Sequence, residues 1–362
     1  MGKPNTKTSP SATRWWIANS WKNWQLKWSR WEYWPFLLIY FPVFIYWIYL
    51  SLKARSPIFF AATNPGIQGG GISGESKHAI YQKIPAAYLP KTFYLAPHQI
   101  EQLTQIIPQL QFPIFAKPDV GKRGRLVKKI DNPETLLAHF ESIKIPMVIQ
   151  QAIAYEEEYS VYYYRFPNAP KGKILSLVHK EYPSVVGDGI HSVEQLMDRD
   201  RRLTYFADTL KPLLPPAKLA EVPQVGEIEI LSYIGNHAQG AIFHDFRAEV
   251  DATLTQTFDH FFQQLEEIYL GRVDLKTPSL QDLKKGIFQV VEINGVGAEL
   301  AHIYATGYPL LKAYREIFHS WHIIYQISQQ NRAQGVRVVS LKEAFNGLTQ
   351  YLQYSRNLKK LI

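Results

Sequence analysis

Two carboxylates and an amide in the C-terminal part of the sequence stand where they could bind a metal ion together. Glu292 and Asn294 lie two residues apart in a strand-like run, so both side chains are expected on one face of a strand. Asp274, in a second strand-like run, would add a carboxylate from the neighbouring strand, while Val291 and Ile293 face apolar packing. Such oxygen ligands suit Mg²⁺. The alternative is a solvent-exposed edge strand, which leaves the apolar flanks and the tight Asn-Gly-Val-Gly ending unexplained.

Lys117 ends an apolar strand-like run and is followed by a loop that contains Gly121 and Gly124. A lysine ammonium at such a place can neutralise phosphate oxygens, while the backbone N–H groups of residues 120–125 close over them. Taken alone, the pattern fits a polar strand end with a tight turn better. The loop is unusually basic, with three further cations, which suits an anionic substrate or a solvent-facing loop: Lys122, Arg123 and Arg125.

The glycine-rich segment 64–77 invites comparison with a phosphate-binding loop. It is not a Walker A sequence, because Glu75 and Ser76 separate Gly74 from Lys77, where that motif has Gly-Lys directly. Glycine would let the backbone approach a substrate closely. A plain surface linker is at least as consistent with the composition.

From residue 90 onward, strand-like and helix-like runs alternate, which predicts an α/β or α+β domain. The expected strands are 92–95, 112–118, 126–130, 147–151, 159–164, 174–179, 270–276 and 287–293. The expected helices are 98–107, 133–142, 252–268 and two more at the C-terminal end.

The composition excludes several kinds of chemistry. The 362 residues include no Cys, so disulfides, thiolate metal sites and cysteine nucleophiles are ruled out. A net charge of +9 is compatible with nucleic acid, an anionic membrane surface or a phosphate-bearing ligand. The soluble part has no dense Lys/Arg run and no interleaved aromatic ladder, so we expect no nucleic-acid partner.

The N-terminal region has a composition of its own, since eight of the nine Trp lie in the first 50 residues. Residues 1–13 resemble a polar tail. Five residues then fall on one face of a predicted helix: Ile17, Trp21, Trp24, Trp28 and Trp31. Trp favours the headgroup region of a bilayer and basic residues favour anionic lipids, so we expect this arm to associate with a membrane. The alternative is an aromatic arm packed on the protein's own body or on a second subunit.

Residues 33–52 carry no charge and are long enough to span a bilayer, but Pro35 and Pro42 are expected to break a helix there. The basic residues before them would hold the N-terminus in the cytoplasm, and a single crossing would then place the remainder outside. A re-entrant hairpin or an in-plane helix resolves this conflict. We therefore expect the protein on the cytoplasmic side of the membrane, by a peripheral, re-entrant or single-span arm, with no secretory cleavage site.

Five motifs occur in the order typical of ATP-grasp enzymes. They are Lys117-Pro118-Asp119 with its glycine loop, Glu158-Tyr159-Ser160-Val161, Arg272-Val273-Asp274, Glu292-Ile293-Asn294, and Val186-Gly187-Asp188-Gly189-Ile190-His191-Ser192-Val193-Glu194-Gln195-Leu196. The chain resembles ATP-grasp carboxylate–amine ligases, specifically D-alanine–D-alanine ligases and the ATP-grasp region of cyanophycin synthetases. The last motif is most similar to the latter, as are Gly235-Asn236-His237, Gly240 and Asp245. The resemblance covers residues 88–310.

The resemblance implies a role for each matching residue. Lys91 and Lys117 would bind phosphate under a loop that contains Gly121 and Gly124. The hinge at adenine would be formed by Gln150, Gln151 and Ile153, and Glu158 would bind ribose. Lys180 would contact phosphate, Arg272 would stabilise the transferring phosphoryl group, and Asp274, Glu292 and Asn294 would hold Mg²⁺, or Mn²⁺ in its place. The implied reaction is ADP-forming ligation of a carboxylate to an amine through an acyl-phosphate.

The implied architecture is an α+β ATP-grasp fold, in which two α/β subdomains grip ATP, with an N-terminal aromatic, membrane-associating helical arm. The expected segments are the arm at 1–58, a glycine-rich loop and small α/β segment at 59–110, the ATP-grasp domain at 111–330, and a helical extension at 331–362. Partners would be small carboxylate and amine substrates, a membrane surface and, in a homodimer, a second copy of the chain. The arm stands where relatives carry a substrate domain, so the substrates stay open. A phosphotransferase or a non-catalytic nucleotide-binding module are the alternatives.

Overall fold

The computed structural model describes residues 27–121 and 124–359, and the chain forms two compact units. The larger unit comprises residues 45–181, 243–305 and 311–362. The smaller comprises 182–242 and 306–310 together with the N-terminal residues up to 44. Each unit takes three separate stretches of chain.

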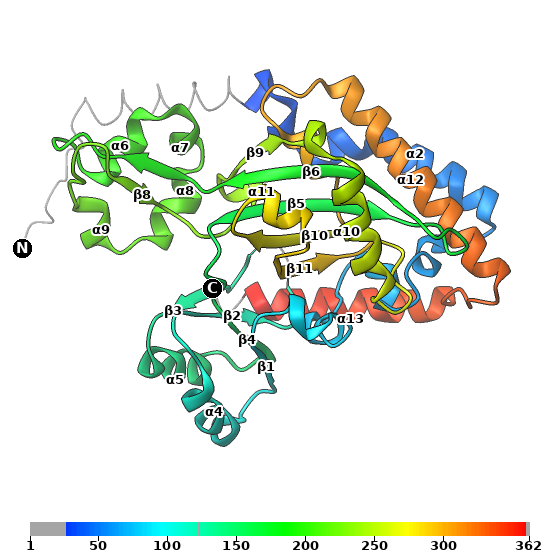
Figure 1. Cartoon of the computed structure of the whole chain (residues 1–362), viewed down its shortest axis with the longest axis horizontal. Helices are drawn as coiled ribbons and strands as arrows, with labels where there is room; N and C mark the ends of the chain where they lie inside the picture. Colours follow the sequence, from blue (N-terminus) through cyan, green and yellow to red (C-terminus); the bar gives the residue numbers. More distant parts are fainter. Residues whose placement is uncertain (1–26, 122–123, 360–362) are drawn as a thin grey trace, which may run out of the picture. The chain divides into compact units, whose positions relative to one another are not determined.

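A four-stranded antiparallel sheet forms one part of the larger unit (Figure 1). Its strands, in spatial order, are β1 (Thr92–Leu95), β4 (Met147–Gln151), β2 (Ile114–Pro118) and β3 (Lys128–Ile130). Helices α4 (Ile100–Ile106) and α5 (Pro133–Ser142) pack on it. The start of α5 follows from local chemistry, because Asn132 caps the N–H of Thr135 at 2.8 Å and proline occupies the first helical position.

A five-stranded sheet forms the other part of the larger unit. Its order is β11 (Gln289–Asn294), β10 (Leu270–Thr277), β5 (Glu157–Tyr164), β6 (Lys173–Glu181) and β9 (Ile242–Asp245). Helix α10 (Ala252–Gln263) buries four apolar residues against this sheet: Leu254, Phe258, Phe261 and Phe262. The expected helix ran on to 268, but it ends at Gln263. This unit also contains α3 (Lys77–Tyr81), α11 (Leu280–Lys284), α12 (Leu310–Ala333) and α13 (Leu341–Lys359). The expected α+β class is confirmed.

Strand β11 contains a bulge that the sequence did not predict. Asp274 of β10 lies opposite Glu292, but the next residue of β10, Leu275, lies opposite Val290. Val291 is therefore an extra residue without a partner on β10. The expectation that Val291 faces the core is wrong, because the bulge gives that place to Val290, which is fully buried beside Ile293.

In its described residues the smaller unit contains a two-stranded antiparallel sheet and four short α-helices. They are β7 (Ser184–Val186), β8 (Ile228–Ile230), α6 (Val193–Arg199), α7 (Arg201–Tyr205), α8 (Ala207–Leu210) and α9 (Pro216–Ala220). Its core includes Val193, Met197, Phe206 and Leu210, and it also takes up Tyr33 from the N-terminal arm. Tyr33 stacks on His237 with ring centroids 5.8 Å apart.

The arm is packed on the protein at two of its aromatic residues. Trp31 is buried and donates from Nε1 to the carbonyl of Tyr308 at 2.6 Å, and Tyr33 accepts from Arg202 at 3.1 Å. For these two residues the packed-arm alternative is confirmed, whereas Trp28 is half exposed. The other members of the expected aromatic face, Ile17, Trp21 and Trp24, lie outside the described residues.

Helix α2 (Phe36–Ala54) runs without interruption through Pro42, so the expectation that this proline breaks the helix is wrong. An interior proline removes one backbone hydrogen bond and costs about 3 kcal/mol, which burial of one whole helix face can offset. That face is formed by Ile39, Tyr40, Val43, Leu50 and Ala54. The opposite face exposes only apolar side chains: Leu37, Leu38, Phe41, Phe44, Ile45, Ile48, Tyr49 and Leu52. By length and composition α2 could cross a membrane, a test that core helices and signal sequences also pass.

Candidate active site

The floor of the candidate site is one face of the five-stranded sheet. Residues directly opposite each other on antiparallel strands share a face, so strand register determines which side chains meet. Asp274 of β10 lies between Ser160 of β5 and Glu292 of β11. In flanking rows, Glu158 lies opposite Lys180 and Arg272 lies opposite Asn294. The register therefore brings together the six residues expected at the transferring phosphoryl group, the ribose and the metal: Glu158, Lys180, Arg272, Asp274, Glu292 and Asn294.

Asp274 is the centre of a buried ion cluster on this floor. Its carboxylate accepts from Lys180 Nζ at 2.9 Å, from Ser160 Oγ at 2.8 Å and from Arg272 Nη2 at 3.3 Å. Lys180 also donates to Glu158 Oε1 at 2.8 Å. Burial alone would raise the pKa of Asp274, but Arg272 and Lys180 lower it to about 2. Burial opposes the charge of Lys180, yet Asp274 and Glu158 raise its pKa overall, so Lys180 and Asp274 both stay ionised.

The donor set for a metal ion consists of two carboxylates and an amide. Asp274 and Glu292 are opposed on neighbouring strands, an arrangement that is unfavourable for two like charges without cations nearby. Asn294 lies beside them, with its Nδ2 3.4 Å from Asp274 Oδ2. In the described part of the chain no three His, Cys, Asp or Glu side chains gather as a metal site. The chemistry of the set, all hard oxygen donors, fits Mg²⁺.

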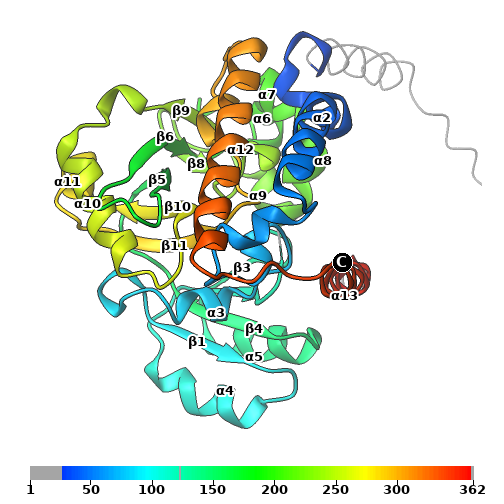
Figure 2. The same ribbon diagram turned by 90° about the vertical axis from the view of Figure 1, so that its right-hand side faces the viewer.

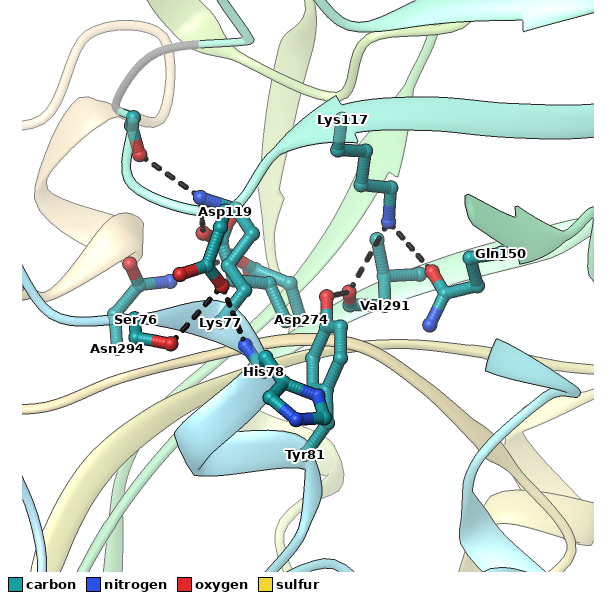
Figure 3. A network of polar contacts seen from close by, with 12 residues as sticks. Ser76, Lys77, His78, Tyr81, Lys117, Asp119, Gln150, Asp274, Val291 and Asn294 are labelled. Carbon is teal, nitrogen blue, oxygen red and sulfur yellow. Dashed lines mark hydrogen bonds and ion pairs between the residues drawn. The ribbon is translucent and has the colours of Figure 1, made fainter. Parts of the chain in front are cut away.

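Lys117 reaches the site from the four-stranded sheet (Figure 3). It is buried, and its Nζ donates to Gln150 Oε1 at 2.6 Å and to the carbonyl of Val291 at 3.4 Å. The bulge explains the second contact, because it leaves Val291 without a strand partner. Tyr81 also donates to this carbonyl, at 2.7 Å. Burial lowers the pKa of Lys117 to about 8, and the charge of Lys77 contributes in the same direction.

Lys77 is a site residue that the sequence analysis missed. Its buried side chain places Nζ 3.4 Å from Glu292 Oε1 and 2.9 Å from the carbonyl of Gly121, to which it donates. Ser76 caps helix α3 and so fixes the backbone from which Lys77 projects. The signal available in the sequence was Ser76 followed by a short helical run, which marks a helix start rather than a loop.

Asp119 holds Lys77 in place (Figure 3). Its Oδ1 accepts from Ser76 Oγ at 3.0 Å and from the N–H of His78 at 2.8 Å. The N–H of Lys77 also donates to the carbonyl of Asp119 at 3.0 Å. The segment that carries Lys77 is thereby tied to the loop after Lys117, so the two ammonium groups are positioned together.

The glycine-rich segment before Lys77 is not a plain surface linker, because part of it is buried. Gly70 and Gly71 are buried, and their carbonyls accept from the N–H groups of Val296 and Gly297 after β11. A Cβ atom added to Gly71 would lie 2.7 Å from Cα of Gly295, so only glycine permits this approach. Gly70 and Gly71 are far apart along the chain from Gly295 and Gly297, yet the two segments form one close backbone contact.

The other expected nucleotide contacts are placed less closely together. Lys91 is exposed and donates to the carbonyl of Gln109 at 3.0 Å, outside the described ion network. The Gln151 side chain donates to Gln111, so of the proposed hinge only the Gln150 side chain meets Lys117, while Ile153 is half-buried beyond it. In the glycine loop, Gly121 accepts from Lys77 and Gly124 has a positive φ of 66°. Lys122 and Arg123 lie outside the described residues.

No protein-family model and no curated protein matches the chain. Among solved structures it is similar to D-alanine–D-alanine ligase from Bacillus anthracis, at 15% identity over 74% of this chain and 70% of that one, with a TM-score of 0.44. It is also similar to VanG D-Ala:D-Ser ligase from Enterococcus faecalis, at 11% identity over 72% of this chain and 61% of that one, with a TM-score of 0.39. A bifunctional glutathione synthetase from Pasteurella multocida is similar at 15% identity over 67% of this chain and 36% of that one, with a TM-score of 0.36. With every one of these TM-scores below 0.5, the function proposed below rests on the chain's own residues.

Proposed function

We propose that the protein is an ATP-dependent, ADP-forming carboxylate–amine ligase of the ATP-grasp type. One observation carries the proposal: two antiparallel sheets and the start of helix α3 place three buried lysines and an arginine around a pair of opposed carboxylates. The four cations are Lys77, Lys117, Lys180 and Arg272, and the carboxylates are Asp274 and Glu292. Such a concentration of fixed charge suits a polyphosphate substrate with its divalent cation better than a neutral ligand.

The proposed role of each residue follows from its charge and its position in the site. Lys77 and Lys117 would bind nucleotide phosphates from the side of the four-stranded sheet. Arg272, planar and always charged, would stabilise the phosphoryl group as it moves to the acceptor carboxylate. Asp274 and Glu292 would hold Mg²⁺, whose charge would offset that of the phosphates when bound. Transfer of the γ-phosphate to the carboxylate releases ADP, and attack by the amine then expels inorganic phosphate.

Release of ADP from ATP tests the proposal directly. Purified protein would be supplied with Mg²⁺ and with amino acids and dipeptides, and hydroxylamine would trap an acyl-phosphate as a hydroxamate. Glu292→Gln should abolish turnover while the protein still melts cooperatively. Glu266→Gln is the matched control, because Glu266 is exposed and pairs with Lys83 at 3.5 Å. Equal activity of the two variants would overturn the metal role, and failure of the wild type to bind ATP would overturn the proposal as a whole.

We further propose that the protein lies on the cytoplasmic side of a membrane, with α2 in the plane of the bilayer surface. One face of α2 contacts the rest of the protein: the Tyr46 hydroxyl lies 3.3 Å from His322 Nδ1, and Arg332 donates to the carbonyl of Ala54 at 2.7 Å. A helix bound in this way cannot be surrounded by lipid. Its exposed, charge-free half is what an interfacial helix immerses.

A further inference from the structure

Helix α13 carries a second exposed apolar surface, which the proposed function does not use. Leu341, Phe345, Leu348 and Leu352 are 63%, 69%, 52% and 48% exposed. Their spacing of four, three and four residues puts them in one row along the helix. We call these four side chains the apolar stripe. Figure 2 shows α13 end-on.

A different face of α13 packs against the segments that position the active-site lysines. Tyr351 lies close to Gly74: a Cβ atom added to Gly74 would be 3.0 Å from Cδ2 of Tyr351. One and two turns later, Tyr354 and Leu358 pack into the core of the four-stranded sheet. Burial, and then the nearby charge of Asp119, raise the pKa of Tyr354 to about 12. Helix α13 therefore contacts both the segment before Lys77 and the surroundings of Asp119, the residue that holds Lys77.

Packing rather than hydrogen bonding holds this part of the helix. The Tyr354 hydroxyl is enclosed, and within residues 27–121 and 124–359 it has no hydrogen-bond partner. In the described part of the chain, no hydrogen bond therefore fixes the Tyr354 hydroxyl to the surface that this helix covers. A force on the outer face of α13 would then reach Gly74 through Tyr351.

The charges beside the stripe indicate what covers it. At 100° per residue, the exposed Lys342 and Arg356 lie along one edge of the stripe, whereas Glu343 lies on the far side of the helix. Glu343 is also occupied, since it accepts from the N–H of Ser340 and pairs with Arg337. A narrow apolar row bordered by cations suits a bilayer with anionic headgroups. A second copy of α13 packed antiparallel on the stripe would instead bring Lys342 of one copy toward Arg356 of the other.

We propose that α13 lies on an anionic bilayer surface through its apolar stripe, and that this contact tightens ATP binding through Tyr351 and Gly74. The second half of the proposal rests on the proposed function, because it requires the lysines to bind ATP. The coupling is expected to be at least roughly fivefold in ATP affinity. Since the attraction is partly electrostatic, it should weaken at high salt.

The test uses the full chain with two kinds of vesicle, pure phosphatidylcholine and phosphatidylcholine mixed with phosphatidylglycerol. Flotation measures vesicle binding, and titration with ATP measures affinity with and without vesicles. The double substitution Phe345→Ser with Leu348→Ser removes half of the stripe. The matched control, Asn346→Ser with Thr349→Ser, changes exposed polar positions on the same two turns. Melting curves establish that both variants are folded.

The stripe variant should bind anionic vesicles roughly tenfold more weakly than the control, and its ATP affinity should no longer respond to them. Equal flotation of the two variants would overturn the proposal. So would a stripe variant that changes only the oligomeric state, which would assign the surface to a second copy. ATP affinity that ignores anionic vesicles in the wild type would overturn the coupling. If the wild type floats but binds no ATP, the proposed function fails instead.

Discussion

Substitution of Asp274 by asparagine should destabilise the protein strongly, although the two side chains have nearly the same shape. Asp274 is 6% exposed and its carboxylate contacts two cations, Lys180 at 2.9 Å and Arg272 at 3.3 Å. Asparagine keeps the volume but removes the charge. Lys180 would then retain only Glu158, and Arg272 would lose the carboxylate nearest to it.

The magnitude follows from the contacts and from the pKa. At 2.9 Å and an effective dielectric constant of 20, one ion pair gains about 6 kcal/mol, of which desolvation takes back a large part. The lowering of the pKa of Asp274 from 3.8 to about 2 corresponds to a net preference for the charged form of about 2 kcal/mol. Removing one partner of a buried pair typically costs about 3–5 kcal/mol, because the other charge is left uncompensated. We therefore expect Asp274→Asn to lower the free energy of unfolding by about 3–5 kcal/mol.

Urea unfolding followed by circular dichroism at neutral pH measures this loss. Asp131→Asn is the matched control, since Asp131 is exposed and its partner Lys129 is 3.9 Å away. An exposed pair of this kind contributes about 0–1 kcal/mol. If Asp274→Asn cost less than about 1 kcal/mol, the cluster would not hold Asp274 as a buried anion, and its lowered pKa would have no structural cause.

Three lysines and the outer face of α2 should also respond differently to substitution. Lys77→Met should weaken ATP binding roughly tenfold or more, since charge-assisted hydrogen bonds contribute about 1.5–3 kcal/mol. The exposed Lys91 should tolerate the same change. Equal losses of ATP affinity in the two variants would contradict the assignment of Lys77 to the phosphate site. Because the pKa of Lys117 is about 8, its charge is present below that pH and lost above it. ATP affinity should thus fall by up to tenfold per pH unit above about 8 and stay constant in Lys117→Arg, and a wild type without pH dependence would refute the shift. Serine at both Phe41 and Ile48 should reduce sedimentation with membranes without altering ATP affinity; unchanged sedimentation would mean that α2 is not the anchor.

Much of the fold could be predicted because local patterns and tertiary packing agree. Strands β1 and β4 and helix α5 begin and end at the expected residues, since each apolar run is bounded by turn or capping residues. The floor of the site was predictable for the same reason: alternation along a strand already places Glu292 and Asn294 on one face.

The features that could not be predicted depend on contacts between distant segments. The bulge at Val291 is a property of register, which appears only when β10 and β11 pair. The role of Lys77 depends on Asp119, whose carboxylate caps the helix that carries it. In the same way, Pro42 can remain inside α2 because a buried helix face offsets the missing hydrogen bond.

The position of α2 in the chain has a consequence for synthesis. It makes polar contacts with α12, and Tyr46 is separated from His322 by 276 residues. Ribosomes add about 5–20 residues per second, so α2 exists for roughly 14 to 55 s before its partner helix emerges. During that interval both of its apolar faces are uncovered. A chaperone or a bilayer surface therefore meets the nascent helix before the rest of the protein can, and the order of synthesis itself gives the membrane first access to α2.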